Sequence, residues 1–384
     1  MTYLDNSATT HLCEDAKSMM QDAIESFGNP SSLHRIGFEA EKLKENARNS
    51  VYKALGVRKL SGDRIIFTSG GTESNHLAIF GCAHAKPSNK GKRIITTDSE
   101  HASVLTPFKM LEKEGFDVVY LPTKDGYIDI EDVKNAVDSN TILISVMAVN
   151  NETGAIYDIQ NIFKTAKMIN PNVTTHCDCV QGFMKMPFYP SKMGVDLCTV
   201  SSHKIHGPKG CGALYISADI IKTKRITPII CGGGQEGNFR SGTENMIGIC
   251  GFGGACEYMF SNIAENIEKL TCLRKYAIEK LSPIVRINEP KKCIPNIVNF
   301  TLPSIRSETM LHYLSNEDIF VSSGSACSSN HAKTASHVLL AFGLSEKEAD
   351  SSLRISFSED NTKEDIDALV NALTRGISTL ARSN

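Results

Sequence analysis

The sequence predicts an α/β protein, with a large unit built on a mostly parallel sheet flanked by helices and a smaller α+β unit. Strand-like apolar runs alternate with helical patterns from about residue 64 to about residue 216, as expected for βα units around a parallel sheet. The pattern changes after about residue 255, where a long helical segment leads into shorter strands. The 384 residues suffice for one large domain and a smaller one.

The first region is predicted to contain seven strands separated by helices. Helical spacing of apolar residues indicates helices at 73–83, 102–114 and 159–168. Ligands of mostly parallel sheets bind at the carboxyl ends of the strands, so we expect functional residues there. The strand ranges are 64–68, 93–97, 117–121, 142–149, 173–178, 196–201 and 211–216.

The second region is predicted to begin with a helix at 263–281, followed by strands near 296–301, 319–322 and 353–357. A last helix follows, because Thr362 and Asp365 resemble a capping box and apolar residues recur at helical spacing up to Leu380. We therefore expect a large domain at 14–255. The small domain is expected to comprise 1–13 and 256–384.

Composition excludes several classes of protein. A hydrophobic content of 41% and a charged content of 22% are those of an ordinary globular protein, and a net charge of −2 provides no basic field for nucleic acid. No apolar run approaches the ~20 residues of a membrane span. Residues 1–6 lack a signal-like pattern, and the 12 cysteines are scattered, which favours reduced thiols in the cytoplasm. No CxxC pair repeats, so we expect no metal site.

Lys204 is the first candidate for chemistry. It follows an apolar, strand-like run, with small and polar residues before it and Gly207 and Pro208 behind it. Such a position can hold an amine partly desolvated, which lowers its pKa and allows it to form a Schiff base.

Gly70, Gly71 and Thr72 follow the strand predicted at 64–68 and open a helix. Glycines let the backbone approach an anion, and the free N–H groups of a helix start attract a phosphate. An ordinary strand-to-helix turn with a hydroxyl cap is the alternative. The segment is not a P-loop, because no Gly-Lys-Ser/Thr follows at the required spacing.

Asp178 ends a predicted strand, and His101 lies just after another. A carboxylate at this place could keep a pyridine nitrogen protonated, although a strand-end aspartate more often caps a turn. His101 could stack on a flat cofactor or move a proton, although a single histidine is more often structural. Period-two alternation places Cys177 and Cys179 on the face opposite Asp178, where we expect them to pack in the core.

Cys327 and Arg354 are the candidates in the second region. Residues 322–329 contain only serine, glycine and alanine besides Cys327, which predicts an exposed loop whose thiol is available as a nucleophile. An incidental surface thiol is the alternative. Arg354 lies in a predicted strand with apolar neighbours and therefore needs an anionic partner. This could be a substrate carboxylate held by a bidentate clamp, or an internal carboxylate.

Together these segments resemble the NifS/IscS-type cysteine desulfurases, which are pyridoxal-phosphate enzymes of fold type I. The resemblance extends over nearly the whole chain, and the order and spacing of its motifs are specific. The motifs are Tyr-Leu-Asp-Asn-Ser-Ala-Thr-Thr at 3–10, Gly-Asn-Pro-Ser-Ser-Leu-His at 28–34, Thr-Ser-Gly-Gly-Thr-Glu-Ser-Asn at 68–75, Glu-His at 100–101, Asn-Asn-Glu-Thr-Gly at 150–154, Ser-His-Lys at 202–204, Arg-Ser-Gly-Thr-Glu-Asn at 240–245, Ser-Gly-Ser-Ala-Cys at 323–327 and Leu-Arg-Ile-Ser at 353–356.

The resemblance implies a role for each matching residue in holding the cofactor. Lys204 would bind pyridoxal phosphate covalently and move protons, and His101 would stack on the ring. Asp178 would pair with the ring nitrogen, while Gln181 would bond the ring hydroxyl. The phosphate would lie against Gly71, Thr72, Ser201 and His203 of the same chain, and against Thr243 of a neighbouring subunit in a homodimer.

The resemblance also implies the reaction and its partners. Asn151 and Arg354 would orient L-cysteine, with Arg354 on its carboxylate. Cys327 would attack the substrate sulfur and become a persulfide, with alanine as the product. The acceptor of that sulfur stays open among an iron–sulfur scaffold, a tRNA-thiolation protein and a general sulfur carrier. The chain ends at Asn384, soon after the last predicted helix, whereas longer relatives carry a tail that helps dock the scaffold.

Two alternatives share these motifs. A selenocysteine lyase or an aminotransferase of fold type I would also use Lys204, Asp178 and the phosphate site, although an aminotransferase has no use for the thiol of Cys327. A sulfur-assembly partner that keeps the fold without the catalysis is the second alternative. The presence of both Lys204 and Cys327 argues against it.

Overall fold

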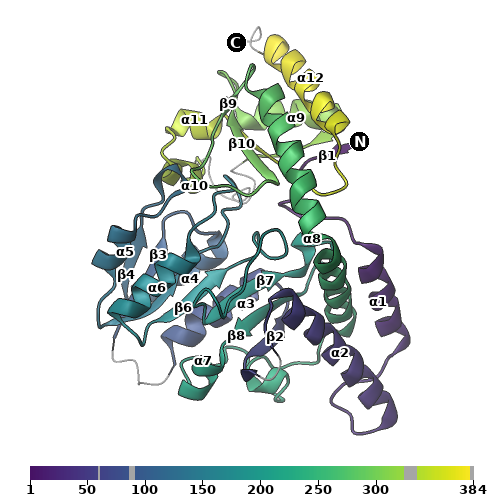
Figure 1. Cartoon of the computed structure of the whole chain (residues 1–384), viewed down its shortest axis with the longest axis vertical. Helices are drawn as coiled ribbons and strands as arrows, with labels where there is room; N and C mark the ends of the chain where they lie inside the picture. Colours follow the sequence, from purple (N-terminus) through teal and green to yellow (C-terminus); the bar gives the residue numbers. More distant parts are fainter. Residues whose placement is uncertain (59–60, 86–90, 324–334, 381–384) are drawn as a thin grey trace.

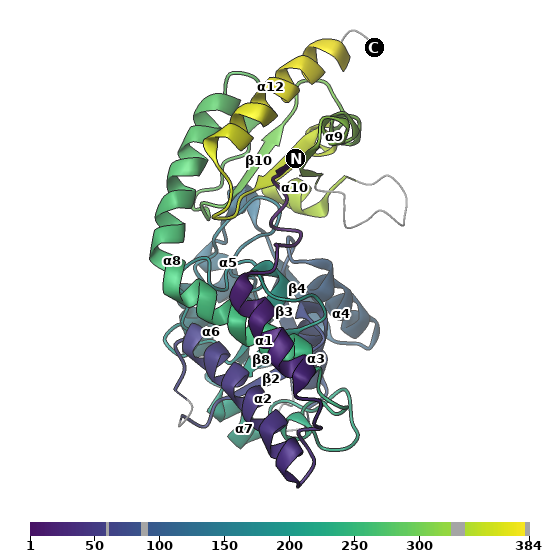
Figure 2. The same cartoon turned by 90° about the vertical axis from the view of Figure 1, so that its right-hand side faces the viewer.

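The computed structural model describes residues 1–58, 61–85, 91–323 and 335–380. In Figure 1 a broad lower part contains a central sheet, and a narrower upper part contains the C-terminal helices and short strands. The long helix α8 (Met246–Leu281) runs from the lower part into the upper part, as Figure 2 also shows. The N-terminus and the helix α12 (Lys363–Leu380) both lie at the upper part.

The central sheet has seven strands in the order β2-β8-β7-β6-β5-β3-β4. The strands from β4 to β7 pair in parallel, whereas β8 is antiparallel to both of its neighbours. This arrangement confirms the mostly parallel sheet predicted from the sequence. The strands are β2 (Arg64–Thr68), β3 (Arg93–Thr97), β4 (Asp117–Leu121), β5 (Thr141–Ser145), β6 (Thr174–Asp178), β7 (Leu197–Ser201) and β8 (Gly212–Ile216).

Helices pack around this sheet. The helix α3 (Gly71–Ala83) crosses β5, β6, β7 and β8, which brings its first turn close to the carboxyl ends of β6 and β7. The helices α1 and α2, which the sequence prediction omitted, pack against α8. The remaining elements of this part are α1 (Glu14–Glu25), α2 (Arg35–Ala54), α4 (Ala102–Lys113), α5 (Ile130–Ala136), α6 (Ile159–Ile169), α7 (Ala218–Thr223) and the 3-10 turns η2 (Lys124–Gly126), η3 (Ser202–Lys204) and η4 (Glu236–Asn238).

The helix α8 begins at Met246, whereas the sequence predicted a start at residue 263. Glycines in this first half lower its intrinsic helix propensity by up to about 1 kcal/mol each, which explains the wrong prediction. Packing overrides the propensity. A Cβ atom on Gly253 would lie 2.7 Å from the Cα atom of Ala47, and one on Gly254 would lie 2.5 Å from the Asp15 carbonyl oxygen. The glycines therefore allow α1 and α2 to approach α8 closely.

The upper part holds an antiparallel sheet in the order β12-β13-β10-β9, and a parallel pair of β1 and β11. The strand predicted near 319–322 is thus divided between two sheets. One of the two bonds of the capping box predicted at Thr362 is present, because the Thr362 amide donates to Asp365 Oδ2 at 3.0 Å. The elements are β1 (Thr2–Tyr3), β9 (Arg286–Ile287), β10 (Ile297–Thr301), β11 (Ile319–Phe320), β12 (Ser322–Ser323), β13 (Ser352–Ser356), α9 (Ser307–Asn316), α10 (His337–Phe342), α11 (Glu346–Asp350) and α12 (Lys363–Leu380).

Two hydrophobic clusters share α8. The first joins its N-terminal half to the central sheet, and the second joins its C-terminal half to β10, β13, α9 and α12. Cys177 and Cys179 are buried in the first cluster, which confirms their predicted place in the core. The domain ranges 14–255 and 1–13 with 256–384 stay a prediction. Within the described ranges, no helix has the length and apolarity needed to cross a membrane.

Candidate active site

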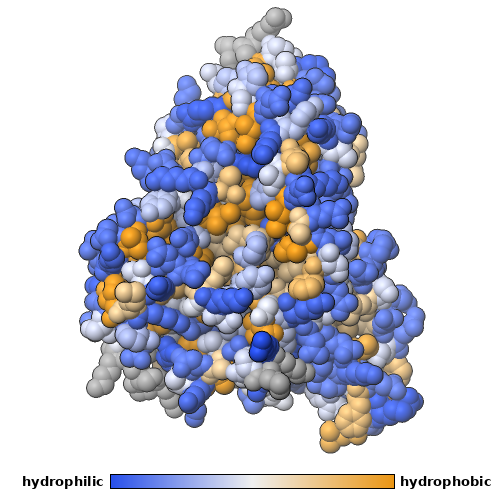
Figure 3. All heavy atoms as spheres, viewed as in Figure 1, coloured by the Kyte–Doolittle hydropathy of each residue, from blue (hydrophilic) through white to orange (hydrophobic). Residues whose placement is uncertain are grey.

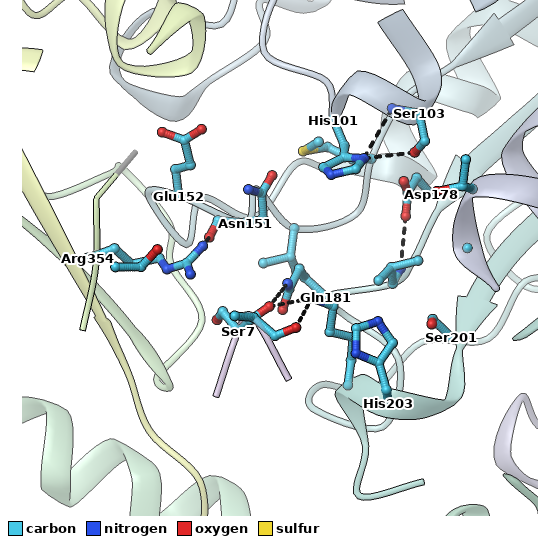
Figure 4. A pocket seen from close by; sticks show the side chains of 18 of the residues that line it. Ser7, His101, Ser103, Asn151, Glu152, Asp178, Gln181, Ser201, His203 and Arg354 are labelled. Carbon is cyan, nitrogen blue, oxygen red and sulfur yellow. Dashed lines mark hydrogen bonds between the residues drawn. The ribbon is translucent and has the colours of Figure 1, made fainter. Parts of the chain in front are cut away.

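A cavity of about 410 Å³ lies at the carboxyl ends of β6 and β7, and segments of the upper part also line it. In Figure 4, Asp178, Ser201 and His203 lie on one side of the cavity and Arg354 lies on the other. Ten of the twelve residues singled out in the sequence line this one space. They are Gly71, Thr72, His101, Asn151, Asp178, Gln181, Ser201, His203, Lys204 and Arg354.

One end of the cavity is the first turn of α3. Its N-cap, Gly70, has a φ angle of 154° and contributes no side-chain cap. A Cβ atom on Gly71 would lie 2.9 Å from Val180 Cγ2, so a larger residue there would displace Val180. The buried hydroxyl of Ser201 has no hydrogen-bond partner among the described residues. Backbone donors at a helix start together with an unpartnered hydroxyl suit a phosphate group.

Asp178 is held at the end of β6 by two donors. Its Oδ2 atom accepts from Asn75 Nδ2 at 2.8 Å, and its Oδ1 atom accepts from the Val180 amide at 3.0 Å. Asn75 is fully buried and also donates to the Ser103 hydroxyl at 2.8 Å. Sequence reasoning gave Asn75 no role, although its position one turn after Gly71 on a helix was a signal. The carboxylate is thus fixed in place on the cavity wall.

His101 caps the start of α4. Its Nδ1 atom accepts from the Ser103 amide at 3.1 Å and lies 2.8 Å from the Ser103 hydroxyl. Burial lowers the pKa of His101, the positive charge of Lys204 lowers it further, and Asp178 opposes the change. A neutral ring with Nδ1 as acceptor carries its proton on Nε2. The amide and hydroxyl of Ser103 therefore orient the His101 ring, which lines the cavity.

Lys204 lies directly after β7 in η3, so the strand brings its amine into the cavity. The amine donates to the carbonyl oxygens of Ser7 at 2.6 Å and Ala8 at 2.7 Å. These acceptors come from the N-terminal segment, and no side-chain pattern could have identified them. Burial, then Lys204 and other lysines, lower the pKa of His203 to about 4, so this ring is neutral at pH 7.

Arg354 connects the N-terminal segment to the cavity. Its Nη2 atom donates to Asp5 Oδ1 at 2.7 Å, and its Nη1 atom donates to the Asn151 carbonyl oxygen at 2.7 Å. The internal carboxylate considered in the sequence analysis is therefore Asp5. The Arg354 Nε and Asn151 Oδ1 atoms are buried and have no partner among the described residues. A ligand of the cavity could therefore accept a hydrogen bond from Arg354 Nε or donate one to Asn151 Oδ1.

Two of the singled-out residues are not in this cavity as described. Cys327 lies outside the described residues. Thr243 is exposed on its own chain and does not line the cavity.

Glu100, next to His101, allows a prediction about stability. It is fully buried, and its Oε1 atom accepts from the Thr97 hydroxyl and the Met147 amide, both at 2.9 Å. Burial, with Asp178 and Asp98 nearby, raises the pKa of Glu100 to about 8. The folded protein therefore holds a proton that the unfolded chain releases above about pH 4.3, so stability falls as pH rises towards 8.

Glu100→Gln removes this pH dependence. The free energy of unfolding of the variant, taken relative to that of the wild type, should rise by about 4 kcal/mol from pH 5 to pH 9, since each pKa unit is worth about 1.4 kcal/mol. Urea unfolding at both pH values measures this difference. The exposed Glu112→Gln change on α4 is the control and should shift by less than about 0.5 kcal/mol. Equal shifts in the two variants would contradict the prediction.

Comparisons with known proteins agree with this geometry. Residues 2–369 match the aminotransferase class-V family. The chain is 44% identical to the cysteine desulfurase IscS of Dictyoglomus turgidum (strain DSM 6724 / Z-1310), over 98% of this chain and 95% of that protein. A solved NifS-like protein superposes with a TM-score of 0.89 at 35% identity, covering 99% of this chain and 100% of that one.

A second solved structure, SspA in complex with cysteine, superposes with a TM-score of 0.80 at 33% identity. It covers 94% of this chain and 100% of that one. The NifS-like neighbours confirm the predicted fold type I and the predicted resemblance. The chain therefore belongs to the aminotransferase class-V family, with IscS and NifS proteins as full-length relatives.

Proposed function

We propose that the protein is a pyridoxal-phosphate-dependent cysteine desulfurase, which converts L-cysteine to L-alanine and places the sulfur on Cys327 as a persulfide. The observation that carries the proposal is the shared cavity of Lys204, Asp178 and the start of α3. An amine, an anchored carboxylate and a phosphate-binding helix start are the three groups that this cofactor requires. The cysteine desulfurases among the relatives support the choice of substrate.

The residues present fit the cofactor. The unpartnered Ser201 hydroxyl and the first turn of α3 would hold the phosphate, and the anchored Asp178 would hold the ring nitrogen. His101 would cover the ring, and Gln181 would donate to its hydroxyl oxygen. When bound, pyridoxal phosphate supplies an aldehyde for amines and a ring that accepts an electron pair from the substrate.

The protein's own groups then perform the remaining steps. Arg354 and Asn151 would hold the substrate carboxylate, using the capacity left at Arg354 Nε. The Lys204 amine would take the α-proton of L-cysteine and later return a proton to the product. The Cys327 thiolate would attack the sulfur of L-cysteine, so that a sulfur–sulfur bond forms as the carbon–sulfur bond breaks. The carbon gains a proton and leaves as alanine, while the persulfide stays on Cys327.

We further propose a homodimer in which Thr243 completes the phosphate site of the partner subunit. Thr243 is exposed on its own chain, as such a role requires. The connection between α1 and α2 exposes Phe27 and Leu33 by 82% and 89%, and Figure 3 shows apolar surface at that end of the molecule. Large exposed apolar side chains of this kind indicate an interface. Light scattering on the purified protein tests the dimer.

Incubation with L-cysteine tests the proposed function directly. We expect the purified protein to show cofactor absorbance, to form alanine, and to gain a sulfur atom on Cys327 in peptide mass spectrometry. Bound cofactor without alanine, and an unmodified Cys327, would overturn the proposal and indicate another fold-type-I activity. Selenocysteine in place of L-cysteine distinguishes a lyase for that substrate. The sulfur acceptor, an iron–sulfur scaffold or another protein, and the cytoplasmic location stay predictions.

Arg354→Gln is expected to raise KM for L-cysteine by about 100-fold, because the charge-assisted contact with the substrate carboxylate is lost. Steady-state alanine formation measures KM and kcat. The change also removes the partner of Asp5, so Asp5→Asn with Arg354→Gln is the matched control. A double variant with wild-type KM would show that the unpaired Asp5, and not the lost substrate contact, caused the effect.

A further inference from the structure

Thr243 is exposed, but its neighbours in the chain are held in place. The Gly242 amide donates to Gln235 Oε1 at 3.0 Å. On the other side, Glu244 Oε1 accepts from the Lys44 amine at 2.8 Å, and both side chains of this pair are buried. Contacts within its own chain therefore fix the backbone on both sides of Thr243.

An ion pair connects this segment to the start of α3. Arg240 Nε donates to Glu73 Oε1 at 2.9 Å, and Arg240 Nη2 donates to Glu73 Oε2 at 3.5 Å. Glu73 lies in the first turn of α3, and its Oε2 atom also accepts from the Ser69 amide at 2.9 Å. A Cβ atom on Gly242 would lie 3.6 Å from Arg240 Nη1, so the guanidinium group lies beside the residue that precedes Thr243. One side chain thus joins the first turn of α3 to the chain next to Thr243.

Glu73 carries a negative charge close to the proposed phosphate site. It lines a cavity of about 480 Å³, as do all four residues of this chain that are proposed to hold the phosphate. Burial raises the pKa of Glu73, but hydrogen bonds from Arg240 and Ser69 outweigh burial and hold the pKa below its ordinary value. The carboxyl group is therefore ionised at neutral pH.

A phosphate dianion would be repelled by this carboxylate unless a cation neutralised it. Arg240 supplies that cation. The side chains of Arg240 and Glu73 are 24% and 13% exposed, so solvent screens their charges only in part. The ion pair therefore has an electrostatic effect on the phosphate site as well as a structural effect on the Thr243 segment.

We propose that Arg240 is a positioning residue that serves two phosphate sites. In its own subunit it neutralises Glu73 beside the phosphate, and for the partner subunit it holds the chain that carries Thr243. The inference deepens the proposed function and rests on the proposed cofactor and homodimer. Loss of one arginine should thus weaken cofactor binding in both subunits, although Arg240 does not line the cofactor cavity of its own chain.

Mixed dimers separate the two effects. One subunit carries Lys204→Ala and a tag for purification, so that borohydride reduction can trap the cofactor only on Lys204 of the other subunit. The protein is first stripped of cofactor and then titrated with pyridoxal phosphate. Peptide mass spectrometry gives the concentration at which half of Lys204 is modified. This half-saturating concentration reports the affinity of one defined site without an activity assay.

Arg240→Gln in the chain that keeps Lys204 tests the effect on its own site. The half-saturating concentration should rise about tenfold, because Glu73 is left unpaired beside the phosphate. Glu73→Gln in the same chain removes that charge and should restore the concentration to within about threefold of wild type. Arg240→Lys keeps the positive charge and should also stay within about threefold. The control, Arg306→Gln, breaks an exposed pair with Asp350 in the upper part and should have no effect.

Arg240→Gln in the Lys204→Ala chain tests the effect on the site of the partner subunit. The half-saturating concentration should again rise about tenfold, as it should for Thr243→Val in the same chain. Adding Glu73→Gln to this chain should not restore the affinity, because the missing contact is the anchor of the Thr243 segment. Glu73→Gln alone loses the anchor without leaving a charge, so it should weaken only the partner's site. It decides the question if Arg240→Gln does not form dimers.

Each failure has its own signature. An unchanged half-saturating concentration for Arg240→Gln in either arrangement would overturn the inference. An effect of Thr243→Val on its own site, with none on the partner's site, would overturn the proposed homodimer contact. A wild-type protein that binds no cofactor would overturn the proposed function itself.

Discussion

Lys204→Ala is expected to abolish alanine formation from L-cysteine, with a loss of kcat of at least about 10⁴-fold. The amine is the group that can both bind the cofactor covalently and carry the substrate α-proton at this position. The cofactor should still bind, because Asp178, Ser201 and the start of α3 remain. Its absorbance should therefore persist but lose its dependence on pH. An assay of alanine together with a pH series of spectra measures both effects.

A small amine added to the solution should partly restore the activity of Lys204→Ala, because it can replace the missing proton carrier. The exposed Lys192→Ala variant is the matched control and should retain wild-type kcat. Retention of more than a few per cent of kcat in Lys204→Ala would show that another base works in this cavity. Lys185 would then be the first residue to examine, since it is the neighbouring amine.

Cys327→Ser is expected to eliminate the added sulfur and to reduce alanine formation by about 10³-fold or more. A thiolate attacks sulfur readily, whereas a serine hydroxyl remains protonated at neutral pH and is a poor nucleophile. Binding of L-cysteine should persist, because Arg354 and Asn151 are unchanged. Peptide mass spectrometry and a substrate-induced change in cofactor absorbance separate the two effects.

The control for this substitution is the exposed Cys231→Ser, which should still form the persulfide on Cys327. A persulfide that appears on Cys231 or Cys272 in wild-type protein, with an unmodified Cys327, would refute the assignment. Both of these cysteines are exposed, so their thiols could also accept the sulfur. Alanine formation at wild-type rate in Cys327→Ser would likewise refute it.

Much of the central sheet could be predicted from the sequence. The ranges 64–68, 93–97 and 117–121 agree with β2, β3 and β4, because each is a short run rich in β-branched and aromatic residues. The predictions failed where packing overrides local preference. In the glycine-rich first half of α8, close packing of α1 and α2 outweighs the low helix propensity of the glycines.

Those residues of the candidate site that act through their side chains could be predicted from sequence motifs. Asp178 ends a strand, and Lys204 and His101 each lie just after one, so topology alone brings them to one edge of the sheet. The Ser7 and Ala8 carbonyl oxygens that accept from Lys204 were not predictable, because every residue carries a carbonyl group. Such contacts depend on the path of the backbone, which the sequence pattern does not record.

The N-terminal segment has a consequence for how the protein is made. The Ser7 amide donates to the Ser356 hydroxyl across 349 residues, and β1 pairs with β11. During synthesis, Ser7 leaves the ribosome long before these partners exist. The acceptors of the Lys204 amine therefore reach their final places only when nearly the whole chain is available. We expect nascent chains to fold the central sheet first and to become competent for cofactor binding only near release.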